Sequence, residues 1–577
     1  MNAPRFIEQL HEAYRFRGKG IVLFTGNVND LFWSPNSGRY LSLEQVLQNE
    51  LQETMTILRY DIGTGVEFVG NGAEEYVEAT YSYANVLSEK KTKTPIADLV
   101  VDVRHSPLPN LVLLKDLMHA FRRARIMEET REKKDRRGHG EKPLCLVVQH
   151  TGMLFPEGDG SRLSDADRER LAFFLSWVND PAFASSSELI ILVSSVRAEV
   201  NTKVTALPHA AHIEIQLPNS DERTHFTERF LENNTVSFEK SKELFIESAA
   251  GLTITTMHEL LRFSASNKGE ITRGQVVDEV NRLLQAKLGD IIRIKYPTHR
   301  STDIVGYART KELLQYTFER CEDPETAVSA VLVAGSNGVG KTFHLEAFAA
   351  ESGRVVIELG NIRGSYFSET DRFFEMFRWY VSTLGRILIL VDEAHTAFGS
   401  VHGNDTHETE KRLAGNVIKM MGDPSLLGKV VWGLMTSRPD ELDPDVKSRA
   451  PIQIPIFDLE DAERKSYIRE IFLKKKMELT DEELETVFAK TLYYSNRDFR
   501  NFVAEVLAER KRQQKEIPIV DVLGRWQASR SIMSKRHFQE LIAALHCSYI
   551  ELLPKRLTEM KEGEIERQVE ILKHSIL

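Results

Sequence analysis

The chain contains 577 residues with a mass of 65.9 kDa, a length that predicts about four domains of ordinary size. Hydrophobic residues make up 42% of it and charged residues 28%, a composition that excludes a disordered or fibrous chain. The formal net charge of −10 argues against broad non-specific binding of nucleic acid, which needs a basic face.

The sequence offers no clear signal for membrane crossing, secretion or disulfide formation. No apolar run approaches the ~20 residues that span a bilayer, and the first ten residues lack the apolar core of a signal peptide. The three cysteines, Cys145, Cys321 and Cys547, lie far apart, which indicates neither a disulfide framework nor a thiolate metal site. We expect a cytoplasmic, soluble, multi-domain protein.

Two apolar runs in the first half have the length of buried parallel strands. Ile21-Val-Leu-Phe-Thr-Gly26 continues into Asn27-Val-Asn-Asp30, and Leu144-Cys-Leu-Val-Val148 continues into Gln149-His150. A glycine directly after a strand is typical of a phosphate loop, but no Gly-Lys-Thr follows the first run. We interpret His150 as a residue that caps the end of a sheet rather than as a metal ligand.

A complete phosphate-binding motif follows the apolar run Val331-Leu-Val-Ala334. The segment Gly335-Ser-Asn-Gly-Val-Gly-Lys-Thr342 fits G-x-x-x-x-G-K-[ST], and helix formers come after it. Glycines allow successive N–H groups to surround the phosphates, and the positive end of the following helix adds to them. We predict that Lys341 reaches the β- and γ-phosphates and that the Thr342 hydroxyl ligates Mg²⁺. The predicted nucleotide-binding residues of the loop are Gly335, Ser336, Asn337, Gly338, Val339, Gly340, Lys341 and Thr342.

Two carboxylates follow the next strongly apolar run, Ile387-Leu-Ile-Leu-Val391. Asp392 is predicted to hold the magnesium, and Glu393 to orient or deprotonate the attacking water, because both stand at the tip of a strand beside the phosphate loop. The letters Asp392-Glu-Ala-His395 also spell a helicase box. A helicase of that type needs a second nucleotide-binding domain with an arginine-rich motif, which is not found after residue 435, so we interpret His395 as incidental.

Further motifs, in their order along the chain, resemble the AAA+ ATPase superfamily and particularly its classical AAA branch. Asp303-Ile-Val-Gly306 resembles the element near the adenine, which implies nucleotide contacts for Asp303 and Gly306. Gly364-Ser-Tyr-Phe-Ser-Glu-Thr-Asp-Arg372 resembles the first pore loop, which implies that Tyr366 and the adjacent Phe367 contact a polypeptide in the pore.

The same resemblance implies three more catalytic residues. Residues 430–440 resemble the sensor-1 strand and turn, with Ser437 at the sensor position and Thr436 as the neighbouring candidate. Residues 441–449 resemble the approach to the arginine finger, which makes Arg449 the predicted finger. Residues 493–501 resemble the sensor-2 helix, with Arg497 at the sensor position and Arg500 one turn away.

The resemblance covers about residues 300 to 515 and implies a fold, an activity and an assembly. The implied fold is α/β, with a parallel five-stranded sheet, flanking helices and a small helical lid. The implied activity is hydrolysis of ATP to ADP and phosphate with Mg²⁺. An arginine finger acts on the nucleotide of a neighbouring subunit, so the implied assembly is a ring, usually of six subunits.

The first half repeats part of this pattern without its chemistry. Residues 189–200 resemble residues 431–442, and Ile213-Glu-Ile-Gln-Leu-Pro218 resembles the stretch from Ile452. We therefore predict two tandem AAA+ modules, of which the first is degenerate. The predicted domains are 1–217 and 218–290 for the degenerate large subdomain and its lid, 291–457 and 458–530 for the active large subdomain and its lid, and 531–577 for a C-terminal helical extension. We expect the amphipathic extension to pack on its own chain, with partner binding as the alternative.

The predicted function is an ATP-hydrolysing machine that remodels or unfolds a protein or protein complex, with the first module as a scaffold. Two alternatives stay open: a nucleic-acid motor or loader on the same fold, and an ATP-dependent assembly switch that threads nothing. The acidic balance and the aromatic pore-loop tip argue against nucleic acid, and Tyr366→Ala would separate threading from switching. A fused zinc protease is not expected, because His258-Glu-Leu-Leu ends in Arg262 rather than in a second histidine.

Overall fold

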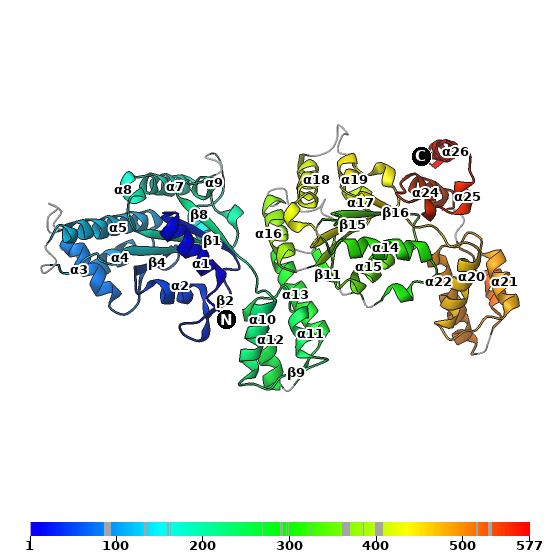
Figure 1. Cartoon of the computed structure of the whole chain (residues 1–577), viewed down its shortest axis with the longest axis horizontal. Helices are drawn as coiled ribbons and strands as arrows, with labels where there is room; N and C mark the ends of the chain where they lie inside the picture. The colour runs from blue at the N-terminus through cyan, green and yellow to red at the C-terminus, as the bar shows by residue number, and fades with distance from the viewer. Residues whose placement is uncertain are drawn as a thin grey trace. The chain divides into compact units, whose positions relative to one another are not determined.

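The fold is described from a computed structural model of the chain. The described residues are 2–85, 94–131, 136–158, 161, 163–267, 269–288, 292–295, 297, 299–323, 325–360, 370–384, 386–398, 408–514, 517–528 and 533–576. They divide into two units, residues 1–276 with 371–379 and residues 277–370 with 380–577. Each unit is described by itself (Figure 1).

The first unit is built on a six-stranded sheet with the strand order β5-β4-β6-β7-β1-β8. Neighbouring strands run parallel except at one edge, where the hairpin strand β5 is antiparallel to β4. Between β1 and β4 in the sequence, β2 and β3 form a separate two-stranded antiparallel sheet. The bounds are β1 (Ile21–Gly26), β2 (Leu31–Ser34), β3 (Arg39–Ser42), β4 (Thr56–Asp61), β5 (Gly65–Val69), β6 (Leu144–Val148), β7 (Leu189–Val193) and β8 (Ala210–Ile215).

Helices cover both faces of the first sheet, and its strands alternate between two apolar cores. In β6, Leu144, Leu146 and Val148 belong to one core, whereas Cys145 and Val147 belong to the other. The first core is closed by α3, α4, α5 and α7, and the second by α1 and α2. The bounds are α1 (Arg5–His11), α2 (Leu43–Leu51), α3 (Ala73–Asn85), α4 (Ile96–Val103), α5 (Pro107–Glu129), α6 (Thr151–Leu154), α7 (Asp165–Val178), α8 (Pro181–Ala184) and α9 (Thr202–Thr205).

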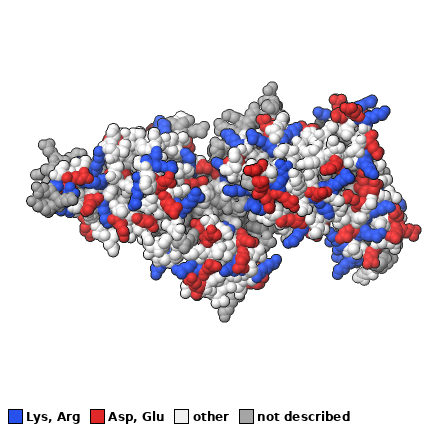
Figure 2. Space-filling view, viewed as in Figure 1, with Lys and Arg blue, Asp and Glu red and all other residues white. Residues whose placement is uncertain are grey.

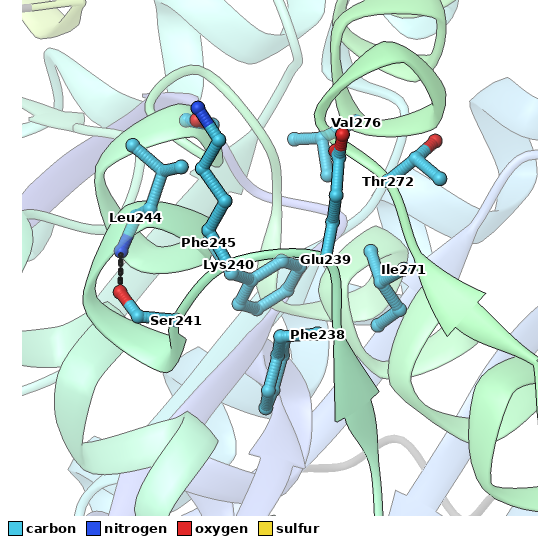
Figure 3. A pocket seen from close by; sticks show the side chains of 10 residues that line it. Phe238, Glu239, Lys240, Ser241, Leu244, Phe245, Ile271, Thr272 and Val276 are labelled. Atoms are coloured by element: carbon cyan, nitrogen blue, oxygen red, sulfur yellow. Dashed lines mark hydrogen bonds between the residues drawn. The ribbon is translucent and has the colours of Figure 1, made fainter.

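A small helical group follows the first sheet. It contains α10 (Ser220–Leu231), α11 (Lys242–Ser248) and α12 (Ile254–Asn267), with the two-stranded pair β9 (Ser237–Phe238) and β10 (Glu270–Ile271). A cavity of about 10 Å³ lies between this pair and α11, where the rings of Phe238 and Phe245 approach to 5.3 Å (Figure 3). That volume holds at most one water molecule, so the cavity is a packing defect rather than a ligand site.

The second unit repeats the sheet topology of the first. Its strand order is β11-β13-β14-β15-β12-β16, again with five parallel strands and one antiparallel edge strand, β11. The predicted five-stranded parallel sheet is therefore confirmed in both units, and each sheet gains one edge strand that was not predicted. The bounds are β11 (Ile292–Lys295), β12 (Ala330–Ala334), β13 (Val355–Leu359), β14 (Ile387–Val391), β15 (Val430–Thr436) and β16 (Ile452–Pro455).

One apolar core joins this sheet to the helices after it. Val333, Leu390 and Ile454 of the sheet share a buried cluster with Phe348 of α15 and Phe502 of α22. The large-subdomain helices are α14 (Ala308–Arg320), α15 (Lys341–Glu351), α17 (Ala394–Ala397), α18 (Glu408–Met421) and α19 (Pro444–Ser448). Helices α13 (Arg273–Leu288) and α16 (Thr370–Thr383) cross the division between the units.

Two helical groups follow β16 (Figure 1). The first contains α20 (Asp461–Leu473), α21 (Asp481–Lys490), α22 (Asn496–Gln513) and α23 (Ile519–Arg525), and the second contains α24 (Met533–Leu545), α25 (Lys555–Thr558) and α26 (Glu564–Ile576). The second group packs around Phe457, which directly precedes the link to α20. Ser548 also hydrogen-bonds both backbone groups of Gln453 in β16, so the extension lies against the edge of the sheet.

Candidate active site

The turn between β12 and α15 requires glycine at three positions. Gly335, Gly338 and Gly340 have φ angles of 153°, 96° and 100°, in the region that side chains disfavour. A Cβ at Gly335 would stand 2.3 Å from the carbonyl oxygen of Ile456, and one at Gly338 would stand 2.9 Å from the Ser495 hydroxyl. The glycines therefore create a cradle of backbone at the start of α15, where the positive end of the helix attracts an anion.

Lys341 is a buried cation that faces this cradle from within. Only 8% of its surface is exposed, and its Nζ donates to the carbonyl oxygens of Gly335 (2.9 Å) and Ser336 (3.4 Å). Burial lowers its pKa, the nearby Glu393 and Asp392 raise it, and Arg497 lowers it. A buried ammonium bonded to neutral carbonyls fits the loop to an anionic ligand such as a phosphate.

The acid pair lies at the end of β14, two strands from the phosphate loop. Because β14, β15 and β12 are adjacent and parallel, their carboxyl ends meet at the same edge of the sheet. The N–H of Glu393 donates to Asp392 Oδ1 (2.9 Å), and Glu393 has a left-handed backbone with φ 45°. This turn sends the two carboxylates out of the strand toward Lys341, whose pKa both of them raise.

Two hydroxyls at the end of β15 lie beside Glu393. The Ser437 hydroxyl donates to Glu393 Oε2 (3.4 Å), and both Ser437 and its neighbour Thr436 are buried. Thr436 Oγ1 accepts the N–H of Arg438 (2.9 Å) and is hydrogen-bonded to His395 Nδ1 (2.8 Å). The structure thus brings the predicted sensor, Ser437, to the predicted base.

His395 joins this group, although sequence analysis assigned it no role. Its Nδ1 lies 2.8 Å from Thr436 Oγ1 and 3.4 Å from Glu393 Oε2, and its Nε2 lies 4.0 Å from a carboxylate oxygen of Glu441. Since the Thr436 oxygen already accepts a backbone N–H, the hydroxyl proton of Thr436 is free for His395 Nδ1. The side chain of His395 thus lies between Glu393 and the end of β15, a position that the sequence pattern did not indicate.

The lid approaches the phosphate loop through the start of α22. The N–H of Arg497 donates to the Gly338 carbonyl (3.3 Å), and Asn496 Nδ2 donates to the Val339 carbonyl (2.9 Å) and to the Tyr307 hydroxyl (2.8 Å). The Arg497 side chain is exposed, and its charge lowers the pKa of Lys341. Sequence analysis missed Asn496, although it stands next to Arg497 in the same motif.

A cavity of about 700 Å³ opens beside the phosphate loop, a size typical of small-molecule sites. Asp303, Ile304, Val305 and Tyr307 line it from the segment before α14. Gly306 has a φ of 75°, and a Cβ there would stand 2.9 Å from Leu459, so this glycine allows close packing on the lid side. Other lining residues are Val339, Gly340, Phe343, His344, Tyr467, Asn496 and Arg500.

Arg449 lies at the opposite edge of the same sheet, where the parallel strands begin, whereas the phosphate loop lies where they end. Its carbonyl accepts the hydroxyl of Ser329, the residue before β12, and its side chain is exposed. A five-residue strand is about 15 Å long, and β12 separates Ser329 from the phosphate loop. Arg449 is therefore remote from the loop of its own chain. The predicted pore residues Tyr366 and Phe367 lie outside the described residues.

The first unit has the same backbone features with different side chains. A Cβ at Gly26 would stand 2.4 Å from the carbonyl of Ile215 in β8, which matches the approach of Gly335 to Ile456. His150 has a φ of 50° at the end of β6, which matches Glu393. His150 Nδ1 lies 2.6 Å from an oxygen of Asp61, and Gln149 donates to Glu44 (2.7 Å), so neither acid of the second unit has a counterpart here.

A buried carboxylate occupies the loop after β1. Asp30 is 2% exposed and accepts hydrogen bonds from Asn27 Nδ2 (2.8 Å), from the N–H groups of Ile254 and Thr255 (both 2.9 Å) and from the Thr255 hydroxyl (3.0 Å). Ile254 begins α12, so a side-chain anion caps a lid helix here.

Two family models match this chain, one in the first unit and one in the second. The family "AAA+ chaperone, N-terminal Rossmann-like domain" matches residues 1–216, and the family "ATPase family associated with various cellular activities (AAA)" matches residues 331–457. The first match contains the whole of the first sheet, and the second contains the second sheet from Val331 onward, without its edge strand β11. The chain belongs to the AAA+ ATPase superfamily.

Curated relatives of this AAA+ chain match it over part of its length. An ATP-dependent zinc metalloprotease FtsH of Halothermothrix orenii is 28% identical over 37% of this chain and 36% of the relative. An ATP-dependent zinc metalloprotease FtsH of Nitrosococcus oceani is 27% identical over 38% of this chain and 37% of the relative. The ATPase family gene 2 protein of Schizosaccharomyces pombe is 27% identical over 34% of this chain and 25% of the relative. The chain spans about a third of the length of the curated relatives it matches.

The AAA family uses ATP with Mg²⁺, and the second module fits both. The glycine cradle and the buried Lys341 suit the phosphates, while Thr342 and Asp392 would hold the metal. Within the described residues, no helix is long and apolar enough to cross a membrane.

Proposed function

We propose that this AAA+ chain hydrolyses ATP in its second module and uses the cycle to remodel or unfold a protein or protein complex. The observation that carries the proposal is the convergence of Lys341, Asp392, Glu393 and Ser437 at one edge of the second sheet. The lid reaches the same edge through Arg497. These are the groups that phosphate binding, metal binding and activation of water require.

The chain's residues divide the chemistry between them. Backbone N–H groups of the cradle and Lys341 Nζ bind the β- and γ-phosphates, and Lys341 leaves its loop carbonyls to do so. Glu393 orients the attacking water and accepts its proton, while the Ser437 hydroxyl donates to the Glu393 carboxylate and the His395 ring lies beside it. When bound, Mg²⁺ neutralises charge on the phosphate oxygens. The cavity beside Tyr307 receives the base and ribose.

The position of Arg449 supports action between subunits. Because it lies at the opposite edge of the sheet from its own phosphate loop, we propose that it completes the site of a neighbouring chain in a ring of six subunits.

 The added positive charge would stabilise the transferring phosphoryl group, an effect worth about 10³–10⁵ in rate in related nucleotide hydrolases. The first module, in which Gln149 and His150 replace the acids, would serve as a scaffold.

The substrate proposed for the ring is a polypeptide, gripped by Tyr366 and Phe367. Acidic and basic side chains are interspersed over the described residues of the face seen in Figure 2, and these residues form no continuous basic track there for a nucleic acid. Proteolysis is not part of the proposal, since the printed sequence contains no His-Glu-x-x-His motif. A loss of substrate remodelling in Tyr366→Ala, with ATP hydrolysis retained, would favour threading over an assembly switch.

The experiment that tests the proposed chemistry compares phosphate release by the wild type, Glu393→Gln and His150→Ala. Glu393→Gln should reduce kcat by at least about 100-fold, because the amide cannot accept the proton of water, and should still bind a fluorescent ADP analogue. His150→Ala is the matched control, since it alters the equivalent strand end of the first module. Full turnover in Glu393→Gln would refute the proposal.

A further inference from the structure

Helix α24 of the C-terminal extension contacts the phosphate loop, a contact outside the predicted site. The side chain of Gln539 is 1% exposed, and its Oε1 accepts the backbone N–H of Asn337 (3.3 Å). A segment some 200 residues from the loop therefore supplies a hydrogen-bond acceptor to the turn that must receive the phosphates. A second side chain of α24, that of Arg536, approaches the neighbouring residue Ser336.

A second residue of α24 connects the loop to the lid and to the segment between β16 and α20, which we call the hinge. Arg536 is 9% exposed, forms an ion pair with Asp458, and donates from Nη1 to the Tyr493 carbonyl (3.0 Å). Its Nη2 lies 3.5 Å from the Ser336 hydroxyl, and its Nη1 lies 4.0 Å from Asp498 Oδ2. Asp458 stands between β16 and α20, whereas Tyr493 and Asp498 flank the start of α22. One guanidinium thus contacts all three parts of the nucleotide site.

Further contacts hold α24 firmly in this position. Glu540 of α24 is paired with Arg556, which is also paired with Glu460 at the start of α20. The ring of Phe538 lies 5.0 Å from the guanidinium carbon of Arg438, just after β15. Because partly buried charged pairs and a cation–π contact fix the helix on several sides, we expect α24 to transmit a displacement of the loop rather than absorb it.

We propose that Gln539 and Arg536 are positioning residues of the ATPase site, which makes the C-terminal extension part of the nucleotide-binding machinery. Gln539 holds the outer turn of the phosphate loop in its binding shape. Arg536 couples that turn to the hinge at Asp458 and to the lid at Tyr493, so that nucleotide occupancy changes the position of the lid. This inference rests on the proposed ATP hydrolysis by the second module.

The test uses Gln539→Met in the full chain, which keeps the length of the side chain and removes its acceptor. The KM for ATP and the Kd for a fluorescent ADP analogue should rise about threefold to tenfold, the effect of one hydrogen bond, with kcat unchanged within about twofold. Lys535→Ala, on the exposed face of α24, is the matched control. If Gln539 had only a structural role, Gln539→Met would lower the melting temperature without raising KM while kcat stays unchanged.

Arg536→Lys provides an independent readout. Lysine keeps the charge beside Asp458 but cannot also reach the Tyr493 carbonyl as a planar fork, so we expect kcat to fall at least about threefold while ADP affinity stays within about twofold. If Gln539→Met fails to fold, Arg536→Lys decides the question. If both variants have the kinetics of the wild type, the inference about α24 is wrong and the proposed function stands. If the wild type itself neither binds nor hydrolyses ATP, both the proposed function and this inference are wrong.

Discussion

At the scale of single residues, the least expected member of the site is His395. Its ring accepts the Thr436 proton and lies against Glu393, so its removal leaves a space beside the carboxylate that is proposed to orient water. We predict that His395→Ala lowers kcat about tenfold, the value of roughly one well-placed hydrogen bond, and leaves KM within about twofold. Steady-state phosphate release measures both constants. An unchanged kcat would show that the contact has no role in turnover.

The charge state of His395 gives a prediction for pH. Burial lowers its pKa below the ordinary 6.5, although Glu393 and Glu441 act in the opposite direction. The imidazole is therefore neutral at pH 7, and its Nδ1 loses the ability to accept the Thr436 proton only in acid. The difference in kcat between the wild type and His395→Ala should be constant from pH 8 to 7.5 and should be halved only below pH 6.5, as the pH falls through the lowered pKa. A difference that is already halved above pH 6.5 would contradict the lowered pKa.

At the scale of elements, the first module joins its lid helix to its sheet through a side-chain carboxylate. Asp30 caps α12, which follows the sheet in the same order as α22 does in the second module, where Arg497 and Asn496 meet the phosphate loop. The lid helix of the first module is thus tied to its sheet by a covalently fixed carboxylate. Because the acceptor belongs to the chain itself, this connection does not change with nucleotide, as expected of a module that serves as a scaffold.

Asp30→Asn should loosen α12 locally. The amide keeps the shape but weakens charge-assisted hydrogen bonds, at a cost of about 1–3 kcal/mol in local stability. Amide hydrogen exchange at the start of α12 should therefore accelerate about tenfold to 100-fold. Asp221→Asn, an exposed first-turn acid of α10, is the control and should leave this exchange unchanged. Equal exchange in both variants would contradict the role of Asp30.

The elements show which features could be predicted from sequence. The phosphate loop and the acid pair are local patterns at strand ends, so their glycines, lysine and carboxylates could be located by spacing alone. The contacts of Tyr307, Asn496 and Gln539 join segments about 150 to 200 residues apart, which no local pattern encodes. The edge strands β5 and β11 were missed because their residues are only partly buried and partly polar, so neither forms an uninterrupted apolar run as β6, β12 and β14 do. Packing of the C-terminal extension on its own chain was predicted, but its contact with the loop was not.

At the scale of the whole molecule, one topology occurs twice with different chemistry. Both sheets have five parallel strands in the same order, and both place a left-handed residue at the end of the same strand. Only the second module contains the lysine and the carboxylates. Since its Arg449 stands at the far edge of the sheet, the account requires two chains to complete one site.

The most direct test of this composite site mixes two inactive variants. Arg449→Ala chains retain Glu393, and Glu393→Gln chains retain Arg449, so random mixing at equal amounts should restore activity at about one quarter of the interfaces of a ring. A mixture of Lys341→Ala and Glu393→Gln is the control and should stay inactive, because both changes damage the same side of the site. Recovered phosphate release in the first mixture alone is the predicted result. Two inactive mixtures, or full activity of Arg449→Ala by itself, would contradict the composite site.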